Sequence, residues 1–408
     1  MNQDFNKDIR SNLHDENNTS FENHIMGIEI NSSLSKKGEL LSKIKKFFIN
    51  VNYGFNEFNQ KRPLVGYSLK RICAAFVTLF LALAILFVLL KMVTPDSAFM
   101  SDINFDKSEI KPGNDAYMKL LNKRKESVGL TGPTIQQILR YFYNILPIFE
   151  KTIYLIDAKG EQHETHQLVY FGLVFSSKFG TPFQQDVWGL FKKAIPTSFK
   201  FGFVAIAATY LIGIPIGILA AKFKDKSVDG IINGFSAFLI AVPPLIIVMF
   251  VFLFSVKLFN ISTIYSPDKI MTFIVPVFVI VLMYIPQVIV QTRRYVVDEM
   301  SSEYTKFAMS KGMSQSRVFF IHIFRNAGIR VIRDIPVFLI ATLFGSSIFT
   351  EQQWSVDGMS QYIVGGVAMR ETFLVMGYVT IAALAGIISS LIADLIMALM
   401  DPRVKLTK

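Results

Sequence analysis

Six apolar stretches constrain this chain more than any other feature of its sequence. They span residues 72–90, 199–221, 231–256, 270–290, 335–348 with its flanks, and 373–400. A helix needs about 20 apolar residues to cross the hydrocarbon core of a bilayer, and the short fifth stretch, which opens at Pro336, reaches that length only with its flanks. A soluble core would have to be unusually large to hide a hydrophobic fraction of 51%. We therefore expect an all-α polytopic membrane protein with six transmembrane helices.

Prolines, which interrupt helices, and small residues inside these stretches indicate how the helices pack. Pro215 interrupts the second stretch, and Pro243 and Pro244 interrupt the third. A bilayer tolerates such prolines where neighbouring helices or water satisfy the freed carbonyls, so we expect them to serve the translocation path or helix packing. Gly213 and Gly217 form a small-residue face that would let another helix approach closely. The sixth stretch has a similar face at Ala382, Gly386 and Ser390.

Asp394 is a carboxylate inside the sixth stretch, about two turns from its end. An ionised side chain in a membrane is costly unless it is paired or hydrated. Asp394 could line the path or bond a neighbouring helix. Its position near the helix end favours the structural role.

Lysine and arginine residues beside the stretches set the expected orientation. They comprise Lys61, Arg62, Lys70 and Arg71 before the first stretch, Lys222, Lys224 and Lys226 after the second, eight residues between Arg293 and Arg333, and Arg403, Lys405 and Lys408 at the end. Short cytoplasmic loops carry an excess of positive charge. Both termini and the loop at 291–334 are therefore expected in the cytoplasm.

The same pattern divides the chain into four parts. Residues 1–66 read as a polar cytoplasmic tail, with an amphipathic stretch at 40–51 that would lie either on the membrane surface or against the membrane domain. Residues 67–91 hold the first transmembrane helix, and residues 92–198 form an extracytoplasmic insert. Residues 199–408 make the core. Within the insert, apolar runs at 154–157 and 168–175 flank a turn at 158–160 and predict a hairpin.

The loop at 291–334 carries the most informative pattern. Tyr304, Phe307 and Ala308 are predicted to share one face of a short helix, with Lys306 and Lys311 on the other. Gly312 ends that helix in the manner of a left-handed cap. Ser314 or Ser316 then caps a second helix with the apolar run 318–324. Such a hairpin suits the transmission of a push from a cytoplasmic partner, and it equally suits a loop that only anchors the bundle.

This loop resembles a known family. Tyr304-Thr-Lys-Phe-Ala308-Met-Ser-Lys311-Gly312 is similar to the Tyr-x3-Ala-x-Ala-Lys-Gly core of the coupling loop in binding-protein-dependent importers of the ATP-binding-cassette class. His322-Ile-Phe-Arg325-Asn326-Ala327 matches the His-x-x-Arg-Asn-Ala of the dipeptide, oligopeptide and nickel permeases of B-subunit type. Asp401-Pro402-Arg403 matches their closing Asp-Pro-Arg, and Leu211 through Gly217 resembles their second span. Glu351 through Gly358 resembles the external stretch before their last span. Ser310 and the pair Lys306-Phe307 depart from the pattern.

The resemblance implies a bacterial cell-membrane permease subunit of an ATP-driven peptide importer. It implies pairing with a second, homologous permease, two ATPase subunits below and an extracytoplasmic peptide-binding protein above. Glu303, Tyr304, Lys306, Phe307, Ala308, Lys311 and Gly312 would couple to an ATPase, supported by His322, Arg325 and Asn326. Ala308 and Gly312 would matter for close docking, and the lysines for electrostatics. No nucleic-acid partner is implied.

The chain itself is not expected to be an enzyme. It has no G-x-x-x-x-G-K-[ST] phosphate loop, so ATP and magnesium would bind to partner subunits, and no cofactor or metal to this chain. Glu351, Arg370 and Glu371 are expected near the external surface, in contact with solvent. Two alternatives remain: a stand-alone secondary transporter or channel, and a membrane-anchored receptor or scaffold. A secondary transporter would favour internal repeats and ionisable groups near the midplane, which the spans do not show, and six spans are more than an anchor requires.

Overall fold

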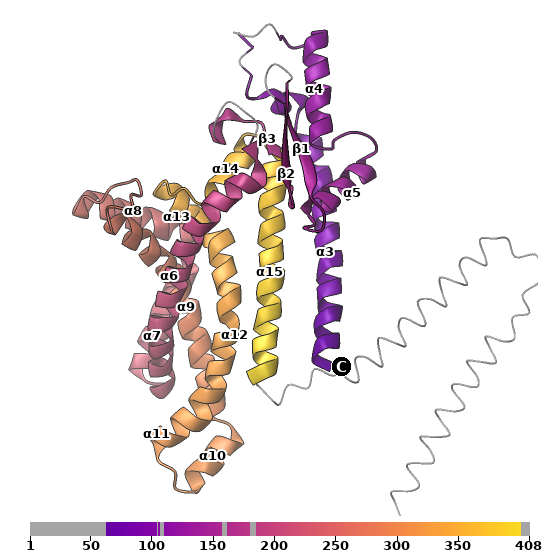
Figure 1. The fold of residues 1–408 in the computed structure, drawn as a ribbon. Helices are drawn as coiled ribbons and strands as arrows, with labels where there is room; N and C mark the ends of the chain where they lie inside the picture. The colour runs from indigo at the N-terminus through magenta and orange to yellow at the C-terminus, as the bar shows by residue number, and fades with distance from the viewer. Residues whose placement is uncertain (1–62, 104, 107–109, 157–160, 180–184, 401–408) are drawn as a thin grey trace, which may run out of the picture. The chain divides into compact units, whose positions relative to one another are not determined.

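The computed structural model describes residues 63–103, 105–106, 110–156, 161–179 and 185–400. The expected tail with its stretch at 40–51, and the closing Asp401-Pro402-Arg403, lie outside the described residues. The chain divides into two units, 1–67 and 68–408. The following description concerns the second unit and the start of the helix that leads into it (Figure 1).

Long apolar helices dominate the described residues, as the sequence predicts. They are α3 (Pro63–Val93), α6 (Val187–Lys222), α7 (Ser227–Ala241), α8 (Pro244–Phe259), α9 (Met271–Met300), α12 (Arg325–Ala341) and α15 (Thr372–Met400). Within the described residues, five helical segments are long and apolar enough to cross a membrane, and the number is six if the bent pair of α7 and α8 counts as one span. The prediction of a polytopic all-α membrane protein is confirmed.

The third predicted span is not one straight helix. Helix α7 ends at Ala241, and α8 begins at Pro244 after a bend of 97°. Pro243 has extended backbone angles, and Pro244 occupies the first turn of α8. Proline at a helix start loses no hydrogen bond, whereas inside a helix it removes one and clashes with the preceding turn. Two consecutive prolines therefore start a new helix instead of kinking the old one.

The fifth predicted span is longer than its apolar stretch suggests. A helical run continues from Gln315 to Gln353 through α11 (Gln315–Val318), a π-helical segment η3 (Phe319–Phe324), α12, a second π-helical segment η4 (Thr342–Ser346) and α13 (Ser347–Gln353). Pro336 lies within α12 and does not open it, contrary to the prediction. The helix of the predicted loop is thus continuous with the fifth span.

Helices α6 and α9 form the closest pair in the bundle, and glycine makes their contact. A β-carbon on Gly217 would lie 2.7 Å from Thr292 Cβ and 2.8 Å from the backbone oxygen of Ile289. A β-carbon on Gly213 would lie 2.9 Å from Val288. The small face predicted on the second span is confirmed as a packing face. The corresponding face on the sixth span differs, because a β-carbon on Gly386 would meet nothing within 4 Å.

The insert between α3 and α6 is a folded layer of short elements. They are η1 (Asp96–Met100), α4 (Asp115–Ser127), α5 (Thr134–Ile145), β1 (Lys151–Ile156), β2 (Gln162–Gln167), β3 (Leu173–Val174), η2 (Ser177–Phe179) and β4 (Gln185–Asp186). Strands β1 and β2 pair antiparallel, with Lys151 opposite Gln167. A hairpin exists where one was predicted, but its second strand is β2 and not the run at 168–175. Residues 170–175 of that run are buried, and β3 within them pairs with β4, whereas Leu168 is exposed.

A buried glutamate ties the insert to the last helix. Glu371, directly before α15, is 2% exposed and accepts hydrogen bonds from the backbone N–H groups of Phe175 (3.2 Å) and Ser176 (2.6 Å). Burial, together with the nearby Asp102, raises the pKa of its carboxyl group to about 7. The expectation that Glu371 is solvated is wrong. The external segment closes over it and supplies the backbone donors that a buried carboxylate needs.

Candidate functional site

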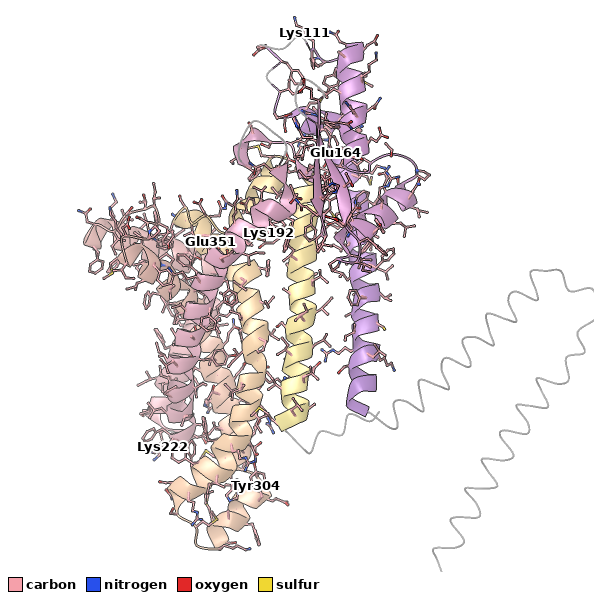
Figure 2. All side chains as sticks on the ribbon, viewed as in Figure 1. Lys111, Glu164, Lys192, Lys222, Tyr304 and Glu351 are labelled. Carbon is pink, nitrogen blue, oxygen red and sulfur yellow. The ribbon has the colours of Figure 1, made fainter. Side chains whose placement is uncertain are left out.

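The candidate site is the helical hairpin formed by α10 (Glu303–Ser310) and α11. In Figure 2 the hairpin, marked by Tyr304, lies at the end of the bundle opposite the insert. Gly312 has φ +77°, the left-handed region that glycine adopts at helix ends. Its N–H donates to the oxygen of Met309 at 2.9 Å, and the Met313 N–H donates to the oxygen of Ala308 at 3.4 Å. These two bonds are a Schellman cap, so the predicted stop at Gly312 is confirmed.

The buried face of α10 is not the predicted one. Thr305 and Ala308 face the chain interior, at 0% and 5% exposure. Phe307 is 60% exposed, and the Lys311 ammonium group lies 4.5 Å from the centre of its ring. Phe307 is therefore on the outer face with Lys306, contrary to the expectation that it shares a face with Ala308. The smallness of Ala308 serves packing within this chain, against Val318 and Ala327.

A polar clasp holds the base of the hairpin. The Thr305 hydroxyl donates to the backbone oxygen of Glu299 at 2.8 Å, which joins α10 to the end of α9. Glu299 is buried, with 5% of its surface exposed, and its carboxylate accepts a hydrogen bond from Arg330 of α12 at 2.8 Å. The Arg330 guanidinium also lies 5.7 Å from the ring centre of Tyr295. Three helices thus meet at Glu299.

A second link joins the hairpin to the start of the fifth span. The Asn326 amide donates to the Tyr304 hydroxyl at 2.9 Å and to the backbone oxygen of His322 at 3.0 Å. The rings of Tyr304 and His322 lie 6.4 Å apart between their centres. The structure thus brings together three residues that the sequence placed in two separate motifs. Arg325 is exposed and lies outside this cluster.

The outer face of the hairpin is cationic and partly apolar. Glu303, Lys306, Phe307, Ser310 and Lys311 are all exposed. Lysine and an exposed aromatic ring together suit a groove that has an acidic rim and an apolar floor. The inner face is fixed by packing and by both links described above. The arrangement presents a contact surface on a rigid support, and it holds no group positioned for covalent chemistry.

The remaining predicted residues lie away from the hairpin. Pro215 is inside α6, and Pro243 and Pro244 make the bend before α8. Asp394 forms an ion pair with Arg71 of α3, whose guanidinium also donates to Ser390 at 2.8 Å. The pairing joins the first and last spans, as expected for the structural role of Asp394. It also explains why a charge is tolerated there.

Sequence reasoning missed a buried polar node at the opposite end of the bundle. Glu351 of α13 is 2% exposed, although it was expected in solvent. It accepts hydrogen bonds from the Ser198 hydroxyl at 2.6 Å and from the Ser360 N–H at 2.9 Å. A β-carbon on Gly358 would lie 2.3 Å from its carboxylate, so only glycine fits beside it. The sequence did contain a signal for this site, because the stretch from Glu351 to Gly358 resembles the stretch before the last span of the permeases named above.

Comparison with known proteins identifies the class of membrane domain. Residues 213–406, which contain the hairpin and both links, match the family described as the binding-protein-dependent transport system inner membrane component. This part of the chain is a permease domain of that kind. The hairpin is the loop whose residues resemble the coupling loop of such permeases, and it lies inside the matched region, which begins within α6 and includes α7 to α15.

Named relatives of this permease are peptide transport components. The oligopeptide transport system permease protein AmiC of Streptococcus pneumoniae is 29% identical over 209 residues, which cover 51% of this chain and 42% of AmiC. The chain thus matches less than half the length of that relative. The dipeptide transport system permease protein DppB of Lactococcus lactis is 26% identical over 84% of this chain and its own whole length. DppB of Bacillus subtilis is 25% identical over 85% of this chain and 99% of its own.

Proposed function

We propose that this permease forms half of the translocation path of an ATP-driven importer of peptides, and that its α10–α11 hairpin couples the path to an ATPase. The observation that carries the proposal is the hairpin itself. It exposes a cationic and aromatic face while Glu299 and Asn326 fix its inner face to three helices of the bundle. A surface loop without a partner would need no such support.

The mechanism follows from the continuity of the helices. Helix α11 continues through η3 into α12, so a force on the hairpin acts directly on the fifth span. Helices often kink at π-helical turns, so the π-helical segment at Phe319–Phe324 is a place where the helix can bend. Such turns are also frequent at functional sites. ATP-driven closure of the partner subunits would push α10, and the clasp at Glu299 would move α9 and α12 as one unit. The bundle would then switch between outward- and inward-facing states.

The proposed orientation places the hairpin in the cytoplasm. Lys222, Lys224 and Lys226 follow α6 at the same end of the bundle as the hairpin in Figure 2, where Lys222 is labelled. Positive charge in short loops favours the cytoplasmic side. The insert would then face outward, where a peptide-binding protein delivers its cargo. The relatives named for peptide transport support peptides as the cargo. The partners proposed are a second permease, two ATPase subunits and a peptide-binding protein, as the resemblance of the coupling loop implies.

Paired charge reversals test the coupling. Lys306→Glu changes the outer face of the hairpin, and Lys224→Glu makes the same change on an exposed residue of another loop at the same end. The complex is purified gently from its native membrane, its subunits are identified by mass spectrometry, and ATP-dependent peptide uptake is measured in proteoliposomes. We expect Lys306→Glu to lose ATPase subunits and uptake while Lys224→Glu keeps both.

Two results would contradict the proposal. Normal ATPase association and uptake in Lys306→Glu would remove the hairpin from the coupling. A wild-type chain that purifies alone, and still moves solute without ATP, would favour a stand-alone transporter or channel.

A further inference from the structure

The insert exposes an apolar surface that the import mechanism does not use. Along α5 the exposed side chains Ile135, Leu139 and Tyr143 follow one another at intervals of four residues, at 74%, 54% and 51% exposure. This spacing places them on a single stripe of the helix. Directly after the helix, Ile148 and Phe149 are 63% and 58% exposed. Soluble domains rarely leave a contiguous apolar surface of this kind uncovered.

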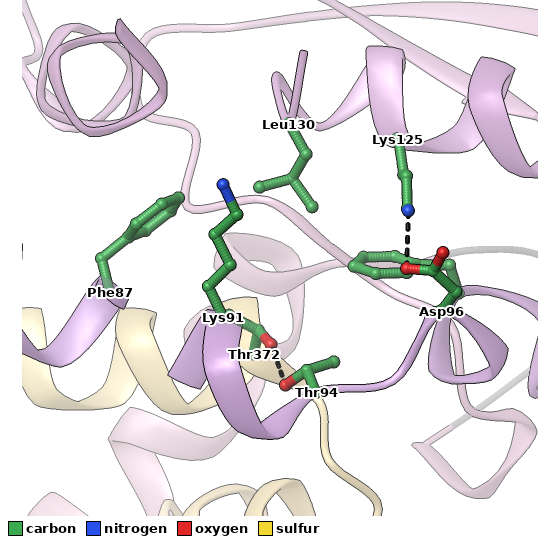
Figure 3. A pocket seen from close by; sticks show the side chains of 8 residues that line it. Phe87, Lys91, Thr94, Asp96, Lys125, Leu130 and Thr372 are labelled. Carbon is green, nitrogen blue, oxygen red and sulfur yellow. Dashed lines mark hydrogen bonds and ion pairs between the residues drawn. The ribbon is translucent and has the colours of Figure 1, made fainter. Parts of the chain in front are cut away.

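Helix α5 does not stand clear of the bundle but runs beside the apolar length of α3. Figure 3 shows Lys91 and Phe87 near the C-terminal end of α3, with Thr94 bonded to Thr372 at the start of α15. The Lys91 ammonium group donates to Thr134 and Gln137 in the first turns of α5, at 3.0 Å each. Helix α5 therefore begins at the level where the charge of Lys91 ends the apolar run.

The C-terminal half of α5 lies beside the middle of α3, further from Lys91 than the start of α5. The Tyr141 ring is 6.3 Å from that of Phe87, and the Phe142 ring is 4.4 Å from that of Phe80. At 1.5 Å per residue, Phe87 and Phe80 lie roughly 6 and 16 Å along α3 from Lys91, towards its middle. The hydrogen bond of 3.0 Å between Tyr141 and Thr380 gives an independent measure. Thr380 is about 12 Å along α15 from its start at Thr372.

Charge distribution on α5 fits this depth. The stripe contains no charged side chain, and the one charged residue of the helix, Arg140, donates back to the oxygen of Gly129 and to Thr131. Lys151, beyond the helix, is 7% exposed and donates to the backbone oxygens of Leu146 and Leu168. Desolvation lowers its pKa.

We propose that α5 and the tip at residues 146–149 are a membrane anchor, embedded in the leaflet at the C-terminal end of α3. The stripe continues the surface that α3 presents to lipid, where Ile85 and Leu89 are 62% and 55% exposed. Since α5 runs along α3, its stripe would face acyl chains beside the C-terminal half of α3. Lipid acyl chains are thus the occupant of the stripe, and the anchor holds the insert at a fixed height above the bundle. The proposal depends on α3 spanning the membrane and not on the cargo.

Spin labels measure the depth of the stripe. Cys73 is the only cysteine in the chain, so Cys73→Ser provides a background for single cysteines. Leu139→Cys and Ile148→Cys sample the proposed anchor. Ile85→Cys on α3 is the lipid-facing reference, and Met118→Cys on α4, an exposed position at 49%, is the aqueous reference. Each variant is purified with its associated subunits into nanodiscs containing phosphatidylglycerol.

Oxygen concentrates in acyl chains, whereas a water-soluble nickel chelate is excluded from them. We expect labels at Leu139 and Ile148 to match the label at Ile85, with a severalfold higher ratio of oxygen to nickel collisions than at Met118. A ratio equal to that of Met118 would place the stripe in water and overturn the proposal. Protection from both reagents would show that another protein subunit covers the stripe, and would overturn it as well.

Discussion

Gly312 offers the sharpest perturbation of the hairpin, because its cost can be worked out from one angle. At φ +77° the backbone is in the left-handed region, and a β-carbon on Gly312 would meet nothing within 4 Å. The side chain of alanine would fit there, but alanine disfavours the left-handed backbone conformation that this position requires. An L-residue other than glycine pays about 1–2 kcal/mol to adopt that region. Asparagine pays less, because its short polar side chain hydrogen-bonds locally.

Hydrogen exchange measured by mass spectrometry reports this loss of stability at the amides of the cap itself. The amides of Gly312 and Met313 donate to the oxygens of Met309 and Ala308 in the cap, so they exchange when the cap opens. A loss of about 1–2 kcal/mol corresponds to roughly 5- to 30-fold faster exchange at these amides. We expect Gly312→Ala to reach this range and Gly312→Asn to fall below it. Peptide uptake should fall in the same order.

Gly328 is the matched control, since it lies in the adjoining helix α12 and a β-carbon on it would also meet nothing within 4 Å. Its backbone is helical, so alanine there should be neutral or stabilise by about 0.5–1 kcal/mol. Equal exchange in Gly312→Ala and the wild-type protein would refute the reasoning. Equal acceleration in Gly312→Ala and Gly328→Ala would do so too, because it would show that space and not backbone angle decides the outcome.

Two further predictions concern packing and protonation. Gly217→Ala should lower the melting temperature in detergent, because the added carbon meets a backbone oxygen of α9 that cannot rotate away, and overpacking costs about 1–3 kcal/mol; Gly230→Ala, whose β-carbon would meet nothing within 4 Å, should not. The Glu371 pKa is raised to about 7, so the folded state binds a proton that the unfolded state has already released. Stability should therefore fall as pH rises from about 4.5 towards 7. Glu371→Gln should flatten this part of the melting-temperature profile, and an unchanged slope in that variant would exclude Glu371 as its source.

The helices of the bundle could be predicted because their signal is local. A run of about 20 apolar residues specifies a span wherever it lies in the sequence, and Gly312 specifies a helix end through its own backbone. The small-residue face that contains Gly217 could also be predicted, but the sequence did not show that its partner would be α9. These features depend on one segment at a time.

The errors arose where two segments decide the outcome. Phe307 was placed on the wrong face, because its hydrophobicity suggested burial while contacts with α9 and α12 gave the inner face to Thr305 and Ala308. Glu351 and Glu371 were expected in solvent, because a charged side chain in a loop is usually exposed. Each accepts a hydrogen bond from a residue more than 150 positions away, Ser198 for Glu351 and Ser176 for Glu371. No pattern within either stretch encodes that pairing.

Photo-crosslinking from the hairpin tests the central claim most directly. A benzophenone amino acid replaces Phe307, which is 60% exposed and makes no part of the clasp at Glu299. Irradiation of native membranes followed by mass spectrometry identifies whatever touches this residue. The account predicts a crosslink to a cytoplasmic ATPase subunit, stronger when ATP holds the partner subunits closed. Crosslinks only to lipid or to other parts of this chain would contradict the account, since the hairpin would then be an anchor of the bundle and not its coupling element.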